Sequence, residues 1–390
     1  MATRYWVGGT GNWSDDTNHW ATSSGGSPGA GNKPTASDNA NFDALSGTGT
    51  VTFNEAAVCL DFVESALSTI TTFAGSSTLA VSGSFTLGLL STWSATGTIT
   101  YNSTSTGKTI TTTGTTINGA ITFDGTGGGW TLQDALTMPS TRTITLTRGT
   151  FDTNGKTVSA GGFSSSNSNT RTLTLGASSI TFAGSSAWNT VTNSNLTFNV
   201  NTSTITCSST STINFSCGSG GGTGLTFNNI VFSALGNELT LQANNTFANL
   251  TITGGTVKTG IVTSLNNQTI TGTFTVTGNS LTNRILVRRN NAGGNSTGTI
   301  TAAAVSLTNV DFQDIVAAGA ASPFTGTSLG DALGNSNITT DTPVTRYWIG
   351  GTGSWSATTE WSASSGGAGS ASVPLCHDTV VFDANSFSAG

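Results

Sequence analysis

Charge is scarce in this chain of 390 residues. Charged residues make up 8% of it, with 12 Lys and Arg against 18 Asp and Glu and a formal net charge of -6, whereas globular domains carry about 25%. The balance is mildly acidic and contains no basic stripe, so the electrostatic pattern of a nucleic-acid-binding protein is missing. Apolar runs fall short of the roughly 18 residues that a membrane-spanning helix needs. The sequence therefore predicts neither nucleic acid as a partner nor insertion into a membrane.

Cysteine and histidine are also rare, which weighs against metal and redox chemistry. The spacing of the four cysteines matches no zinc or redox motif, and buried free thiols are the simplest interpretation. The two histidines, His19 and His377, occupy non-equivalent places in a repeated motif described below. We therefore predict no metal site, no cofactor and no catalytic residue. The cysteines are Cys59, Cys207, Cys217 and Cys376.

Short alternating segments fill most of the chain instead. Between residues 50 and 278, stretches such as "GTITY" and "SITF" alternate an apolar residue with Thr or Ser and end in Gly, Asn or Ser. A period of two followed by turn residues indicates β-strands with one buried face. The abundance of β-branched and aromatic residues argues against disorder. These features predict an all-β fold.

Internal similarity indicates which all-β architecture is present. "SITFAGSS" from Ser179 resembles "TITCSSTS" from Thr204, and "RTLTL" from Arg171 is followed by "NLTF" from Asn195. A repeat of about 25 residues suits one coil of a solenoid, in which each coil stacks on the next. The sequence predicts a right-handed parallel β-helix. Stacked β-sandwiches are the alternative, and they would require two or more domains.

One aromatic, glycine-rich phrase occurs twice. "TRYWVGGTGNW" begins at Thr3 and "TRYWIGGTGSW" at Thr345, and each is followed by another Trp, a Pro, an Asp and a Phe-Asp pair. Bulky rings beside glycines, which permit close backbone approach, would plug the exposed apolar end of a solenoid. We predict that the following side chains form caps or an interface: Tyr5, Trp6, Trp13, Trp20, Phe42, Tyr347, Trp348, Trp355, Trp361 and Phe382.

The pattern RYW-GGTG-W, then W, P, D and FDA, is similar to the Trp-rich box that opens tandem β-solenoid modules in uncharacterised bacteriophage and bacterial surface proteins. The segment from Ser306 to Thr339 resembles the coil that closes such modules. The resemblance implies four parts. These are an N-terminal cap box at residues 1–49 (box 1), a β-solenoid body at 50–305, a closing coil and linker at 306–341, and a second Trp-rich box at 342–390 (box 2) that starts a further, truncated module.

Candidate binding residues lie in the predicted body. Exposed indoles stack on sugar rings, so Trp93, Trp130 and Trp188 are candidates for glycan contact, with burial in the core as the competing interpretation. Paired acids cleave glycans. The spacing of the three body acids does not place them on one stacked ridge, and roles in turns are the simpler interpretation. These acids are Asp124, Asp134 and Asp152.

Two smaller patterns allow alternatives. Each box carries two aspartates that suit either calcium or hydrogen bonds from nearby backbone N–H groups, and the second option is favoured. The basic residues Arg284, Arg288 and Arg289 suit an acidic partner, although a loop joining the last coils is the simpler interpretation. The box aspartates are Asp38, Asp43, Asp378 and Asp383.

The expected function is structural. The resemblance implies a non-catalytic attachment protein, a bacteriophage tail fibre or virion surface component that binds a glycan or protein of the host surface and other virion subunits. Met1 leads directly into box 1 without a signal-peptide pattern, which favours a virion protein assembled in the host cytoplasm. The alternatives are a secreted bacterial adhesin or extracellular filament subunit and a glycan-cleaving tailspike. Homo-oligomers through the boxes are a further option.

Overall fold

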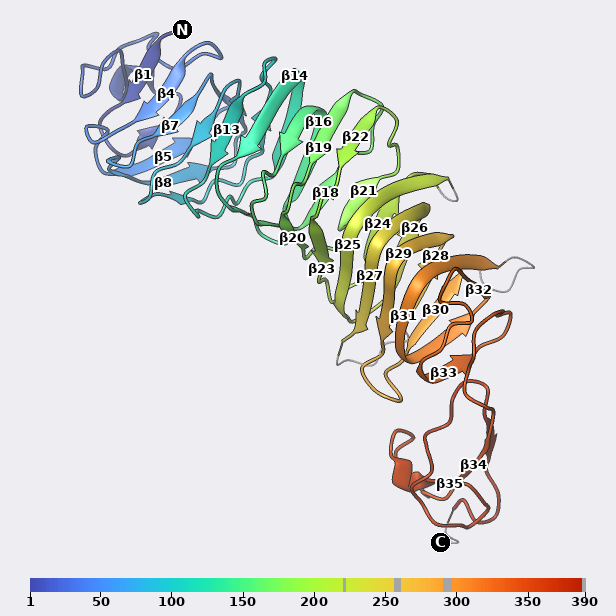
Figure 1. Cartoon of the computed structure of the whole chain (residues 1–390). Coiled ribbons are helices and arrows are strands. Elements are labelled where there is room, and N and C mark those ends of the chain that lie inside the picture. The colour runs from blue at the N-terminus through green and yellow to red at the C-terminus, as the bar shows by residue number, and fades with distance from the viewer. Residues whose placement is uncertain (220–221, 256–260, 290–296, 388–390) are drawn as a thin grey trace. The chain divides into compact units, whose positions relative to one another are not determined.

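The chain folds almost entirely as β structure. The computed structural model describes residues 1–219, 222–255, 261–289 and 297–387, so the last three residues of box 2 lie outside the described part. The fold is a parallel β-solenoid, which confirms the predicted parallel β-helix over stacked sandwiches. The chain divides into two compact units, Met1–Cys207 and Ser208–Gly390, and both carry stacked coils (Figure 1).

Unit 1 begins with box 1 and continues as coils of three short strands. Box 1 contains the one-turn helix α1 (Asp16–His19), which is followed directly by the strand β3 (Trp20–Ala21). The first parallel ladder of the unit comprises β1 (Thr3–Trp6), β4 (Asn39–Phe42), β7 (Phe62–Glu64), β10 (Phe85–Thr86), β13 (Lys108–Thr111), β14 (Ile121–Leu132), β16 (Thr143–Asp152), β19 (Arg171–Thr174) and β22 (Leu196–Asn199).

The strands on the other two sides of the coils also pair in parallel. The second ladder comprises β6 (Ala57–Cys59), β9 (Leu79–Val81), β12 (Ile99–Tyr101), the first halves of β14 and β16, β18 (Gly162–Ser164) and β21 (Trp188–Thr190). The third side comprises β2 (Gly11–Asn12), β5 (Gly49–Phe53), β8 (Ile70–Gly75) and β11 (Thr92–Trp93), followed by β15 (Leu136–Thr137), β17 (Val158–Ala160), β20 (Ser179–Phe182) and β23 (Thr204–Cys207).

The internal repeats of the sequence are neighbours in the stack. Ser179 of β20 is the register partner of Thr204 in β23, and Arg171 of β19 is the partner of Leu196 in β22. Parallel, in-register stacking places equivalent residues of successive coils directly above one another. The repeat seen in the sequence is therefore one coil of the solenoid.

A narrow aromatic and aliphatic core runs along the inside of the coils. Alternate residues of each strand point inward, so Phe42, Phe62 and Phe85 stack with ring centroids 5.1 and 5.0 Å apart. Burial of a side chain of this size contributes about 1.5–3 kcal/mol. In strands such as β16 and β20, Thr residues take outward positions between the inward apolar residues, in keeping with the Thr-rich composition.

Unit 2 repeats the arrangement with longer strands, and the pairings of these strands contain register shifts. One side comprises β24 (Ile213–Cys217), β26 (Leu239–Gln242), β28 (Ile261–Leu265), β30 (Ile285–Arg289), the last residues of β31 and β33 (Thr327–Asp331). The long strands are β25 (Thr223–Leu235), β27 (Asn244–Gly254), β29 (Gln268–Thr277) and β31 (Gly298–Gln313), and β32 (Ile315–Ala318) pairs with β31. Box 2 contributes β34 (Thr345–Trp348), the 3₁₀ turn η1 (Thr358–Glu360), β35 (Trp361–Ser362) and β36 (Thr379–Val381).

The basic segment of unit 2 is a strand and not the expected loop. Arg288 and Arg289 belong to β30, which pairs with β28 and β31. Arg284, directly before this strand, forms an ion pair with Asp311 at 2.8 Å and also donates to the Ser328 carbonyl at 2.7 Å. The Arg284 guanidinium therefore holds neighbouring coils together.

Candidate interaction surface

The two boxes share one local fold. In box 1, β1 pairs antiparallel with β3 and parallel with β4. In box 2, β34 pairs in the same way with β35 and β36. In both boxes an indole N–H donates to a backbone carbonyl of the same box. These bonds are Trp6 to Gly9 at 2.8 Å, Trp20 to Trp13 at 2.9 Å, Trp348 to Gly351 at 3.1 Å and Trp361 to Trp355 at 2.8 Å.

The box aspartates accept hydrogen bonds from the backbone, as predicted. Asp38 accepts from the Ala2 N–H at 3.0 Å, and Asp378 accepts from the Val344 N–H at 2.9 Å, so both carboxylates fix the start of their box. Although burial opposes ionisation of Asp38, hydrogen bonds from Thr35 and Ala2 hold its pKa below the ordinary value. The second aspartates accept at 2.9 Å from the residue two positions on, Asp43 from Leu45 and Asp383 from Asn385.

Box 1 closes over the first solenoid coil. Trp6, Trp13 and Trp20 are buried and meet edge to face, with Trp13 and Trp20 centroids 4.8 Å apart. Trp13 packs against Phe53 of β5 at 5.3 Å. Phe42 of β4 continues the stack into the coils. Box 1 therefore covers apolar core that a terminal coil would otherwise leave in water.

The residue before the third Trp differs between the boxes. His19 stacks on Trp6 at 4.6 Å, and its Nδ1 lies 2.8 Å from the Val7 carbonyl. A Cβ at Gly11 would meet this imidazole at 2.0 Å, so a side chain at Gly11 has no space. In box 2, Glu360 precedes Trp361 in the equivalent place. The histidine of box 1 is thus part of the packing.

Part of the cap or interface set predicted in box 2 is exposed, unlike the corresponding residues of box 1. Trp355 and Phe382 are 45% and 54% exposed, as is Phe387 at 55%, whereas Trp348 and Trp361 are buried. Tyr5 and Tyr347 are half-buried in their boxes. In the last coils of unit 2, Phe324 is buried and lies 6.5 Å from Phe274. We call Trp355 and Phe382 the open face.

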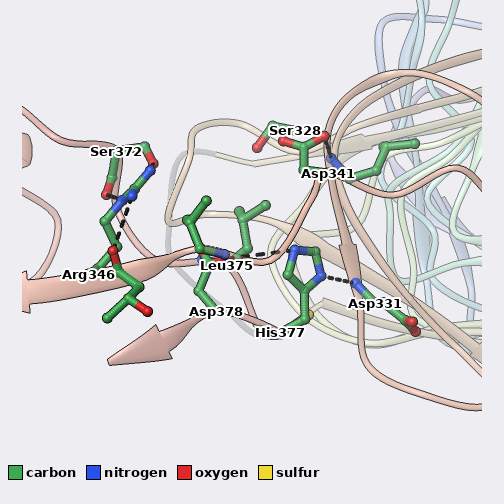
Figure 2. Close-up of polar contacts among 12 residues, drawn as sticks. Ser328, Asp331, Asp341, Arg346, Ser372, Leu375, His377 and Asp378 are labelled. Carbon is green, nitrogen blue, oxygen red and sulfur yellow. Dashed lines mark hydrogen bonds and ion pairs between the residues drawn. The ribbon is translucent and has the colours of Figure 1, made fainter. Parts of the chain in front are cut away.

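Polar contacts join box 2 to the last coils (Figure 2). The Asp331 N–H donates to His377 Nδ1 at 2.8 Å, and His377 Nε2 lies 3.8 Å from Asp378 Oδ1. Cys376 is exposed, contrary to the prediction of buried thiols, which holds for the other three cysteines. Its thiol donates to Asp311 at 3.5 Å, and partial desolvation together with this carboxylate raises its pKa to about 12. Sequence analysis missed this junction, because no motif marks it and its partners lie far apart in the chain.

The predicted glycan contacts required exposed indoles, and the structure contradicts this prediction. Trp93, Trp130 and Trp188 are buried. Trp93 packs among the phenylalanines of the first coils, with Phe73 at 5.4 Å. It also lines a hollow of about 290 Å³ together with Ser91, Thr92, Ser94, Thr115, Thr116 and Asn118. Because the indole faces are covered by the core, none of the three can stack on a sugar.

The body acids have separate structural partners. Asp124 forms an ion pair with Arg148 at 3.4 Å. Asp134 accepts from the Thr112 N–H at 2.9 Å, and Asp152 accepts from the Asn154 N–H at 2.7 Å. Asp134 and Asp152 lie at a bend and at a strand end, as the sequence favoured, whereas Asp124 lies within β14. In the described ranges, no group of three or more His, Cys, Asp and Glu residues is placed to hold a metal ion.

Comparisons with known protein families, curated proteins and solved structures found no match to this chain. Within the described residues, no helix has the length and apolar character to cross a membrane.

Proposed function

We propose that this chain is a non-catalytic structural and attachment protein, a bacteriophage tail fibre or virion surface component that binds a host-surface glycan or protein. The observation that carries the proposal is the recurrence of one box fold in both units, with the same strand pairing and indole hydrogen bonds. Recurrence of one folded unit is typical of a protein built by stacking repeats.

The surface chemistry supports a structural role. Outward strand positions carry mostly Thr, Ser and Asn, and the charge content is low. The body acids are engaged in structural contacts, and glycan cleavage requires two carboxyl groups about 5–10 Å apart across a groove. The proposal therefore assigns the chain no reaction.

Immunogold electron microscopy tests the assignment. Antibodies against the full chain are applied to phage particles and to cells of the source organism. Gold on virion fibres or on the virion surface is the expected result. Gold on the cell envelope alone would identify an adhesin or filament subunit and contradict the virion assignment. Release of oligosaccharides from host capsule or lipopolysaccharide by the purified chain would contradict the non-catalytic role.

A further inference from the structure

The open face of box 2 is unusual because its counterpart in box 1 is buried. Trp355 corresponds to Trp13, and Phe382 corresponds to Phe42. In box 1 these side chains are 1% and 0% exposed, against 45% and 54% in box 2. The internal hydrogen bonds of the two boxes match. The difference in exposure therefore arises from the residues that cover each box. Large exposed aromatic side chains gathered on one face mark an interaction site.

Box 1 shows what such a face accepts. Phe42 lies 5.1 Å from Phe62 and 5.0 Å from Phe73, and Trp13 lies 5.3 Å from Phe53. Phe53 of β5 and Phe62 of β7 are inward residues of the first coil, and Phe73 of β8, which pairs in parallel with β5, belongs to the next coil. The Trp13 N–H also donates to the Thr52 carbonyl of β5 at 2.9 Å. The first two coils therefore cover this face.

A free strand edge lies next to the open face. In box 1, β4 pairs in parallel with β7 of the first coil, and the Ala40 N–H donates to the Asp61 carbonyl at 2.8 Å. In box 2, the equivalent strand β36 pairs with β34 alone among the described strands. Val380 is the counterpart of Ala40. An unpaired edge is a template for an added strand.

We infer that the open face and the free edge of β36 together form the docking site for further β-solenoid coils, with inward phenylalanines arranged as Phe53, Phe62 and Phe73. The inference goes beyond host attachment, because it concerns how one module joins the next. A second copy of box 2 is a poorer occupant. Two-fold symmetry would pair two β36 strands antiparallel, whereas the corresponding edge in box 1 is paired in parallel.

An extended chain tests the inference. Residues 387–390 are replaced by a second copy of residues 47–341, so that box 2 is followed by the coils that follow box 1. Hydroxyl-radical oxidation read by mass spectrometry reports the exposure of Trp355 and Phe382, and hydrogen exchange reports the Val380 amide. In the extended chain, Trp355 oxidation falls several-fold to the rate of Trp13, and exchange at Val380 slows.

The matched control carries Phe53→Asn, Phe62→Asn and Phe73→Asn in the added copy only. Trp355 in this control oxidises at the rate of the original chain. A second arm needs no extension, because Phe53→Asn in the first coil raises Trp13 oxidation toward the Trp355 rate.

Three results would overturn the inference. One is unchanged Trp355 oxidation in a folded extended chain, and another is an unchanged Trp13 rate in the Phe53→Asn chain. The third is protection of Trp355 in the original chain that grows with protein concentration, because it would identify a second copy as the occupant.

Discussion

Single buried polar residues hold neighbouring coils together in this protein. Arg171 of β19 is 1% exposed, and its guanidinium donates to four backbone carbonyls at 2.7–2.9 Å. Its Nε also donates to the Ser165 hydroxyl at 2.7 Å. The carbonyls belong to loops of adjacent coils, so one side chain fixes several turns. The acceptors are Ser165, Asn169, Thr192 and Ser194.

Replacement of Arg171 is expected to destabilise unit 1. Arg171→Met removes all five donated bonds from a buried site, which lowers the free energy of unfolding by about 3 kcal/mol or more. Arg171→Lys keeps the charge with fewer donors, so its loss is expected to be smaller. Urea unfolding followed by tryptophan fluorescence measures both variants. A Met variant as stable as the parent would contradict this role.

Glu64 gives unit 1 a pH dependence. This buried carboxylate accepts from the Gly88 N–H at 2.8 Å and the Ser91 hydroxyl at 2.6 Å. Burial is the largest effect on it and raises its pKa above the ordinary value of 4.5. The folded state therefore binds the proton more tightly than the unfolded state. The contribution of Glu64 to stability is greatest below pH 4.5 and decreases as pH rises through the folded-state pKa.

Glu64→Gln tests this sign. Gln keeps an oxygen acceptor for both donors and cannot ionise. The variant therefore does not lose the stability that the parent loses when Glu64 ionises at high pH. We expect its free energy of unfolding to exceed that of the parent at pH 8. The advantage is expected to shrink toward zero below pH 4. Denaturant unfolding across this range measures the difference, and a difference independent of pH would contradict the assignment.

At the level of whole elements, the boxes show what a sequence can and cannot predict. The spacing of Trp, Gly, Asp and Phe-Asp predicted two equivalent boxes, because these residues bond within the box. The exposure of Trp355 was not predictable, since the sequence around it matches that around Trp13 and only the covering coils differ. Arg171 shares the parity of the inward Leu173, and that pattern was the one available sign of its burial.

The junction of box 2 with the last coils includes one imidazole acceptor. The Asp331 N–H donates to His377 Nδ1 at 2.8 Å. His377→Ala removes this acceptor and is expected to speed hydrogen exchange at Asp331. His377→Asn is the matched control, because its side-chain oxygen replaces Nδ1 as acceptor. Equal exchange at Asp331 in the Ala variant and the parent would contradict this role.

Considered as a whole molecule, the chain derives its stability from stacking. Each coil contacts its neighbours, and burial of inward Phe, Ile and Leu replaces the large single core of a globular domain. Period-two alternation and a repeat of about one coil sufficed to predict this, since both follow from local geometry. Trp93 follows this alternation, since Ser91 and Ala95 are buried and Thr92 and Ser94 are exposed. Trp130 and Trp188 each directly follow a buried residue, so alternation alone did not predict their burial.

The most direct test of box 1 as the lid of the first coil is the oxidation rate of all nine tryptophans in the native full-length chain. Hydroxyl-radical labelling with mass spectrometry resolves them individually. We expect Trp355 to oxidise fast and the other eight, all 5% exposed or less, to oxidise slowly. Oxidation of Trp6, Trp13 and Trp20 as fast as that of Trp355 would place the box 1 indoles in water and contradict the capped solenoid.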